Sequence, residues 1–156
     1  MRKSRAMIDV LRSPGHLVSL AARGFSRLSE ARLKPLGFGV GTLPVLIALE
    51  EGRAHTQRDL ADFARIEQPS MAQMLARMER DGLIRRTPDP RDGRSSLVAL
   101  TDAARTRLPD ACAVLFAGND EALAGLTQAE AVQFVALLER VIDNLDQIAK
   151  KGDAGR

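Results

Sequence analysis

The hydrophobic pattern of residues 56–101 changes its period once, and this change restricts the folds open to the chain. Before Gly82, apolar residues recur every three or four positions, which is the spacing of one helix face. After Gly82, two short apolar runs, 84–87 and 97–100, flank the turn-forming residues 88–95. We therefore predict two short helices followed by a two-stranded hairpin with a polar tip, held in place by the rest of the chain.

The composition indicates a single, mainly helical (α+β) domain covering residues 1–156. Hydrophobic residues make up 45% of the chain, but aromatic residues only 3%, without Trp or Tyr, so aliphatic residues that favour helices must form the core. One cysteine excludes an intrachain disulfide, and the chain has no apolar run of about 18 residues. We expect a cytoplasmic protein that neither enters nor crosses a membrane.

Charge is divided unevenly along the sequence. Residues 1–101 carry 17 Lys/Arg and 11 Asp/Glu, whereas residues 102–149 carry 3 and 8. A basic part joined to an acidic part is typical of a nucleic-acid-binding unit with a non-binding scaffold, although surface charge also segregates without such a function.

Capping signals divide the chain into six expected helices. Ser13-Pro14 opens a helix that ends near residue 34, and a second, almost wholly apolar helix covers 42–51. Thr56 with Asp59 and then Pro69 begin helices at 56–64 and 68–81. Further helices are expected at 101–116, ending before 118–120, and at 127–148. We expect the first several residues to be mobile and residues 150–156 to be disordered.

The helix at 68–81 has two chemically different faces. Met71, Met74 and Met78 lie on one face, where we expect core packing. The opposite face carries polar residues suited to base edges and phosphates, and its expected DNA contacts are Gln68, Ser70, Gln73, Arg77 and Arg80. The alternative is an ordinary solvated face, which the hairpin beside the helix makes less attractive.

The hairpin tip carries two further cations. Arg91 and Arg94 project from a turn that Asp89 and Asp92 are expected to brace by ion pairing. An arginine held at a hairpin tip can enter a narrow minor groove, where the negative potential is strongest. Arg85 and Arg86 begin the first strand, and alternation places one of them inward, where a phosphate contact and an internal salt bridge are both open.

These motifs resemble the MarR family of bacterial transcriptional regulators. The resemblance rests on TQRDLADF, QPSMAQMLARMERD and GLIRRTPDPRDGRSSLVALT, chiefly the D-x-R tip Asp92-Gly93-Arg94. It implies a winged helix-turn-helix at 42–101, with a two-stranded wing, and dimerisation helices at 13–35 and 102–149. The sequence departs from a common habit of such turns in having Arg65 where glycine often lies.

The resemblance implies a homodimer that binds double-stranded DNA. An apolar stripe on the last helix supports dimerisation independently, and the expected interface comprises Leu17, Leu115, Val135, Leu138, Val141, Ile142 and Leu145. Proteins resembling this family often bind small aromatic carboxylates or phenols, and His16 and Arg23, two turns apart, could hold a carboxylate.

We therefore expect a regulator, most simply a repressor released from its operator by such a ligand. Three alternatives remain open: redox control through Cys112, a winged helix that binds only protein, and an enzyme. The sequence offers no nucleophile paired with a base, no phosphate-binding glycine loop and no metal-ligand cluster. We accordingly expect neither catalysis nor a cofactor.

Overall fold

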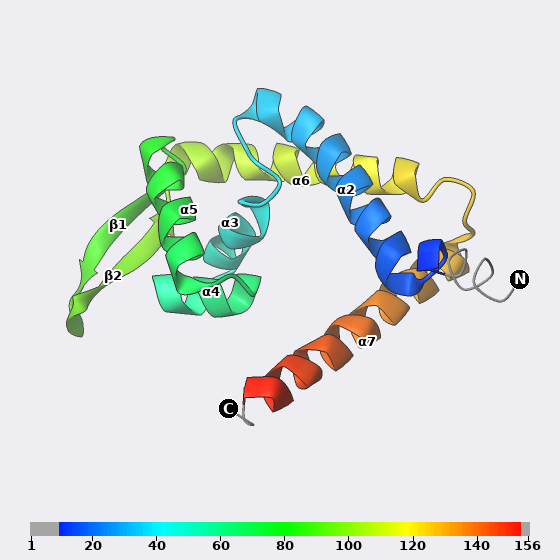
Figure 1. Cartoon of the computed structure of the whole chain (residues 1–156). Helices are drawn as coiled ribbons and strands as arrows, with labels where there is room; N and C mark the ends of the chain where they lie inside the picture. Colours follow the sequence, from blue (N-terminus) through cyan, green and yellow to red (C-terminus); the bar gives the residue numbers. More distant parts are fainter. Residues whose placement is uncertain (1–9, 154–156) are drawn as a thin grey trace, which may run out of the picture. The chain divides into compact units, whose positions relative to one another are not determined.

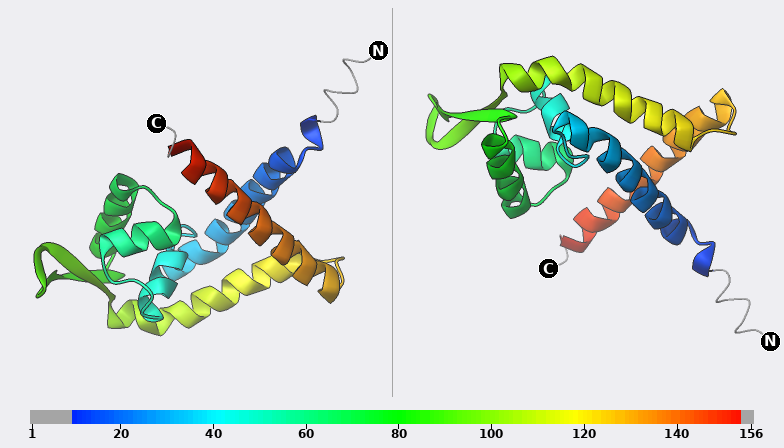
Figure 2. Two further views of the ribbon diagram at one scale, coloured as in Figure 1. Left: turned by 90° about the horizontal axis from the view of Figure 1, so that it is seen from below. Right: turned by 90° about the horizontal axis from the view of Figure 1, so that it is seen from above.

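A computed structural model describes residues 10–153 of the chain. Residues 1–9 and 154–156, for which mobility and disorder were expected, lie outside the described residues. The chain divides into two compact units, Met1–Gly118 and Asn119–Arg156, which are treated separately below. Within the first unit, Figure 1 and Figure 2 show a strand hairpin projecting from a group of short helices.

The first long helix begins where its capping signal predicts. Helix α2 spans Pro14–Leu33, and the hydroxyl of Ser13 accepts a hydrogen bond from the backbone N–H of His16 at 3.4 Å. The short 3-10 helix η1 (Lys34–Leu36) follows, and Gly37 ends it with φ +78°. Most of α2 is exposed until Ser29 and Leu33, which are buried.

Helix α3 (Leu43–Glu50) supplies the centre of the core, as its apolar composition predicts. Leu43, Val45, Leu46 and Ala48 are almost completely buried. They join one hydrophobic cluster with side chains from α4, α5, the hairpin and the first turns of α6. The winged unit is therefore built around this helix, and Gly52 terminates it with a positive φ.

Helices α4 (Gln57–Ala64) and α5 (Gln68–Arg80) form the predicted helix-turn-helix. Thr56 and Asp59 make a complete capping box, because each side chain accepts a hydrogen bond from the other residue's backbone N–H. The predicted internal face is confirmed: Leu60, Ala61, Met71, Leu75 and Met78 are buried, while Ala64, Ile66 and Met74 pack against them.

Arg65 closes α4 in the left-handed conformation, with φ 54° and ψ 45°. This is the only non-glycine residue with positive φ among residues 10–153. The turn therefore keeps the geometry that glycine usually supplies, at a conformational cost to an L-amino acid. Having Arg65 in place of glycine therefore does not change the geometry of the turn between α4 and α5.

Relief of this strain should be measurable by comparing Arg65→Gly with Arg65→Ala. Both variants remove the same side chain, but only glycine adopts positive φ without a steric penalty. We expect Arg65→Gly to be more stable than Arg65→Ala by about 1 kcal/mol in urea unfolding. Equal stabilities, or a more stable alanine variant, would show that this position carries no backbone strain.

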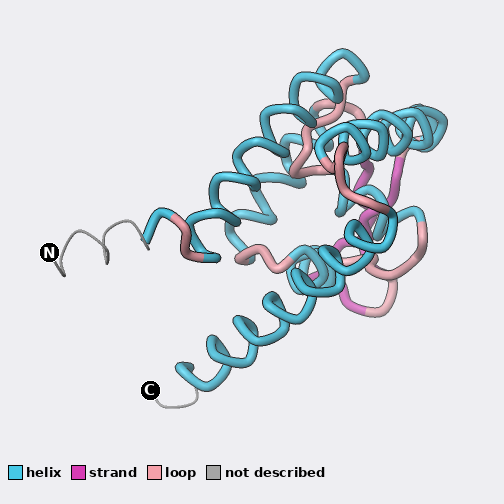
Figure 3. The backbone as a smooth tube through the Cα atoms, turned by 90° about the vertical axis from the view of Figure 1, so that its right-hand side faces the viewer, coloured by secondary structure: helices cyan, strands magenta, loops and turns pink. Residues whose placement is uncertain are grey.

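The hairpin is longer than its sequence pattern predicts. Strands β1 (Ile84–Asp89) and β2 (Asp92–Leu100) are antiparallel, with Ile84 opposite Leu100 and a register irregularity between Pro88 and Asp89. Most residues expected in the turn, 88–95, thus belong to strands, because backbone pairing continues through polar residues as far as the tip. Figure 3 distinguishes the two strands, in magenta, from the helices, in cyan.

The hairpin is attached to the segment that precedes α4. The backbone N–H of Val98 donates to the carbonyl of His55 at 2.7 Å, and Thr56 forms an isolated bridge with Leu97. The hairpin is therefore anchored to the N-terminus of α4 as well as to the core, which fixes its base relative to the helix-turn-helix.

Helix α6 (Asp102–Ala122) begins as predicted but ends later. The hydroxyl of Thr101 accepts from the N–H of Ala104 at 3.2 Å, which caps the first turn. The predicted break at 118–120 is wrong. Gly118 is buried within the helix, and a β-carbon there would lie 3.6 Å from a methyl group of Leu28, an ordinary contact distance, so this part of the helix packs against α2.

The second unit contains α7 (Gln128–Asp153), which is longer than predicted. The capping box is confirmed: Glu130 accepts from the backbone N–H of Thr127 at 2.7 Å, and these hydrogen bonds lower the pKa of Glu130. The helix continues past residue 148 to Asp153, so the expected disorder of residues 150–153 is wrong. Within residues 10–153, no helix is long and apolar enough to cross a membrane.

Candidate nucleic-acid interface

Helix α5 separates its core face from a polar face, as the sequence predicts. Ser70, Gln73, Arg77 and Arg80 are all exposed, whereas Met71, Leu75 and Met78 on the other face are buried. Glu67 precedes the helix without a side-chain capping hydrogen bond. The backbone N–H groups of Gln68 and Ser70 therefore remain available to an anion such as a phosphate, while Pro69 between them has none.

The tip of the hairpin holds Arg91 and Arg94 through their backbones. The Asp89 carboxylate accepts from the backbone N–H of Arg91 at 2.8 Å, and the Asp92 carboxylate accepts from that of Arg94 at 3.0 Å. The predicted bracing by ion pairing is therefore corrected: each carboxylate fixes a turn, rather than its neighbour's guanidinium. Both arginine side chains are exposed.

Strand alternation assigns different environments to Arg85 and Arg86. Arg85 is exposed, whereas Arg86 turns inward, and its Nε lies 3.2 Å from a carboxylate oxygen of Glu79 on α5. The N–H does not point at that oxygen, so the buried Nε has an ion-pair neighbour without a hydrogen bond. Of the two roles left open for the inward arginine, the internal salt bridge is the one observed.

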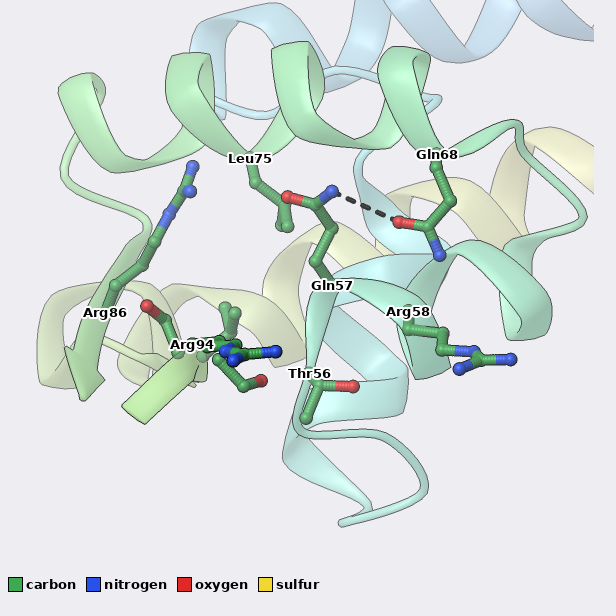
Figure 4. A pocket seen from close by; sticks show the side chains of 10 residues that line it. Thr56, Gln57, Arg58, Gln68, Leu75, Arg86 and Arg94 are labelled. Carbon is green, nitrogen blue, oxygen red and sulfur yellow. Dashed lines mark hydrogen bonds between the residues drawn. The ribbon is translucent and has the colours of Figure 1, made fainter. Parts of the chain in front are cut away.

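A polar pocket of about 280 Å³ lies between the hairpin and the start of α4 (Figure 4). None of its lining residues is acidic, and three are arginines. The residues that line it are Thr56, Gln57, Arg58, Gln68, Leu75, Arg86, Arg94, Ser95, Ser96 and Val98. The lining of the pocket thus comes from both the wing and the helix-turn-helix, and its positive charge favours anions.

Gln57 and Arg58 also belong to this surface, although their sequence pattern does not predict it. The side-chain amide nitrogen of Gln57 donates to the amide oxygen of Gln68 at 3.1 Å. These residues are eleven positions apart and come together only because α4 and α5 cross. The capping box indicates that Gln57 begins a helix, but no local pattern indicates its partner.

The predicted effector residues both lie on α2. His16 is half-buried and Arg23 is exposed, seven residues further along the same helix. A carboxylate bound between them would need a second wall, because the first half of this helix is largely exposed in the single chain.

Cys112 has the properties of a packed residue rather than of a redox sensor. It is half-buried on α6 and lines a pocket of about 220 Å³ with Ile47, Leu108 and Pro109, and burial raises the pKa of its thiol. Arg105 lines the same pocket, but its Nε is 2.9 Å from Glu50. A sensor thiol needs a lowered pKa, so redox control through Cys112 gains no support.

The expected dimer residues occupy two kinds of environment. Leu115 packs partly against the core of its own unit. In contrast, Leu17, Val135, Val141, Ile142 and Leu145 are 44–59% exposed, which is unusual for large apolar side chains that recur along a helix. Leu138 lies on the same stripe of α7 and is half-buried.

Comparison with known proteins supports the winged helix fold and relates its central part to one family. A model of the MarR family matches residues 42–96, which contain α3, α4, α5, β1 and most of β2. Residues 42–96 are therefore similar to the MarR family. Over 150 residues the chain is 25% identical to the uncharacterized HTH-type transcriptional regulator YybA of Bacillus subtilis, covering 94% of this chain and 97% of that protein.

Two solved MarR-like structures extend the comparison beyond the winged region. The PcaV transcriptional regulator from Streptomyces coelicolor, in complex with its natural ligand, is 27% identical with a TM-score of 0.75 and covers 85% of this chain and 94% of its own. The transcriptional repressor CouR, bound to a 23-mer DNA duplex, is 22% identical with a TM-score of 0.79, covering 86% and 95%. The chain thus shares the fold of these winged helix proteins along most of its length.

Proposed function

We propose that two copies of this MarR-like chain bind a pseudo-palindromic DNA operator and regulate transcription from it. The observation that carries the proposal is the polar face of α5. It is exposed opposite the face that packs on the core, and it lies beside a hairpin with two exposed arginines. The chemistry of Gln73 and Arg77 suits base edges in a major groove, and Arg94 suits the adjacent minor groove. Arg80, Ser70 and the N-terminus of α5 would contact phosphates.

The proposed dimer forms through the apolar stripe of α7, with Leu17 of α2. A single short helix and one wing would bind DNA weakly, whereas two copies at a fixed separation engage successive major grooves about 34 Å apart. The exposure of Val135, Val141, Ile142 and Leu145 in one chain supports this arrangement, since a partner would remove these apolar side chains from water.

We further propose that the chain is a repressor whose ligand is a small aromatic carboxylate or phenol. His16 and Arg23 would hold the carboxylate in a cleft completed by the dimer. Ligand binding would favour a dimer in which the two α5 helices no longer match successive grooves. The support from relatives is that CouR is a DNA-bound repressor and that PcaV has been crystallised with a natural ligand.

The proposal is tested by the sequence preference of a Gln73→Ala variant. A residue that reads a base edge should change which sequences bind, and each lost base contact should reduce discrimination at one base pair by about 1–3 kcal/mol. A gel-shift with the promoter of the chain's own gene, followed by selection from random duplexes, measures both effects. The proposal fails if the unmodified chain binds no duplex even at low salt, where phosphate contacts are strongest.

A further inference from the structure

The side chains of Gln57 and Gln68 form a hydrogen bond that joins the first residues of two helices. Gln57 begins α4 and Gln68 begins α5, and the Gln57 amide nitrogen donates to the Gln68 amide oxygen at 3.1 Å. Figure 4 shows this contact above the polar pocket, with the amide nitrogen of Gln68 directed away from Gln57. The oxygen of the Gln68 amide therefore accepts from Gln57, while its NH2 group faces away from this contact.

The surroundings of Gln57 are consistent with this orientation. Arg86 and Arg94 line the same pocket, and Figure 4 places the carbonyl oxygen of Gln57 on the side of Arg86 and its amide nitrogen on the side of Gln68. A carbonyl dipole is favoured when its oxygen faces positive charge. The arginine side of the pocket thus leaves the NH2 group of Gln57 to donate to Gln68.

We propose that Gln57 is a positioning residue for DNA binding, which fixes the side-chain amide of Gln68 with its NH2 group toward the DNA. This inference rests on the proposed function. Gln68 is exposed at the start of α5, where a helix-turn-helix approaches the duplex. The acceptors there include phosphate oxygens, purine N7, guanine O6 and thymine O4, and each of them pairs with a donor.

The hydrogen bond would act by pre-organisation rather than by adding a contact to DNA. An exposed glutamine samples many rotamers and presents either end of its amide, so binding must select one of them. A fixed amide avoids that selection. The effect of Gln57 on affinity should therefore exist only while Gln68 is present.

A double-mutant cycle tests this dependence directly. Gln57→Met keeps the length of the side chain but removes the donor, and Gln68→Ala removes the amide that it positions. With a duplex selected from a random library by the unmodified chain, Gln57→Met should weaken binding about three- to tenfold. In the Gln68→Ala background the same change should cost less than about twofold.

Gln57→Glu provides a second cycle that inverts the amide instead of releasing it. A carboxylate only accepts hydrogen bonds, so it would draw the NH2 group of Gln68 inward and turn its oxygen toward the DNA. We expect a larger loss than for Gln57→Met, roughly tenfold or more, that again shrinks in the Gln68→Ala background. The comparison with the Gln68→Ala background also corrects for the added negative charge, because Gln57→Glu adds the same charge with and without Gln68.

The two cycles separate this inference from a purely structural role. If Gln57 only stabilised the crossing of α4 and α5, its replacement would lower the thermal midpoint and weaken binding equally in both backgrounds. An additive cycle with Gln57→Met and with Gln57→Glu would overturn the inference while leaving the proposed function intact. If the unmodified chain selects no duplex, the proposed function and this inference both fail.

Discussion

The Arg94→Ala variant is expected to bind its operator about 100-fold more weakly than the unmodified chain, because each of two copies loses a charged contact worth roughly 1.5 kcal/mol. Arg94 is exposed at the hairpin tip, and the Asp92 carboxylate holds its backbone N–H at 3.0 Å. The guanidinium is thus presented from a fixed turn. Titration by fluorescence anisotropy at several salt concentrations measures the loss.

The salt dependence identifies the origin of that loss. If Arg94 neutralises phosphate charge, the slope of log K against log salt should fall by roughly two for a dimer. Arg140→Ala is the matched control, because it removes the same charge from an exposed position on α7, outside the winged unit. Equal losses for the two variants would indicate a general charge effect and contradict a specific role for the wing.

The second large effect is expected at the apolar stripe of α7. Val141 and Leu145 are 46% and 59% exposed in the single chain, so replacing both with aspartate should leave the individual chain folded. In a dimer the same changes would place carboxylates against apolar side chains, at a cost of at least about 4 kcal/mol. We expect a monomer of 16.9 kDa by size exclusion with light scattering, together with loss of operator binding.

A single charge on the other side of α7 separates this effect from general destabilisation. Gln147 is exposed and lies two residues from Leu145, about 160° away around the helix at 3.6 residues per turn. Gln147→Asp should therefore keep the dimer and its affinity for DNA. A dimeric Val141→Asp, Leu145→Asp variant would show that the stripe is not the interface.

Local signals in the sequence predicted the helix starts well. Ser13, Thr56 and Thr127 each cap the helix that they were expected to cap, because a cap depends on residues within four positions. The buried faces of α4 and α5 also follow from short-range periodicity. The polar face of α5 was predicted as a consequence, since a helix that buries one face exposes the other.

Errors arose where tertiary contacts override local preference. Gly118 was expected to end a helix, but it lies against Leu28, which the sequence places 90 residues earlier. The strands extend through Pro88, which pairs with Ser96, because the ladder continues where residue types suggest a loop. Gln57 was missed for the same reason: its partner is on another helix.

The most direct measurement of the central claim is a hydroxyl-radical footprint of the unmodified chain on its selected duplex. Two copies reading one operator should protect two segments whose centres are about 10–10.5 base pairs apart, in successive major grooves. Protection of the flanking minor grooves should mark the two wings and disappear with Arg94→Ala. A single protected segment, or none at low salt, would contradict the account.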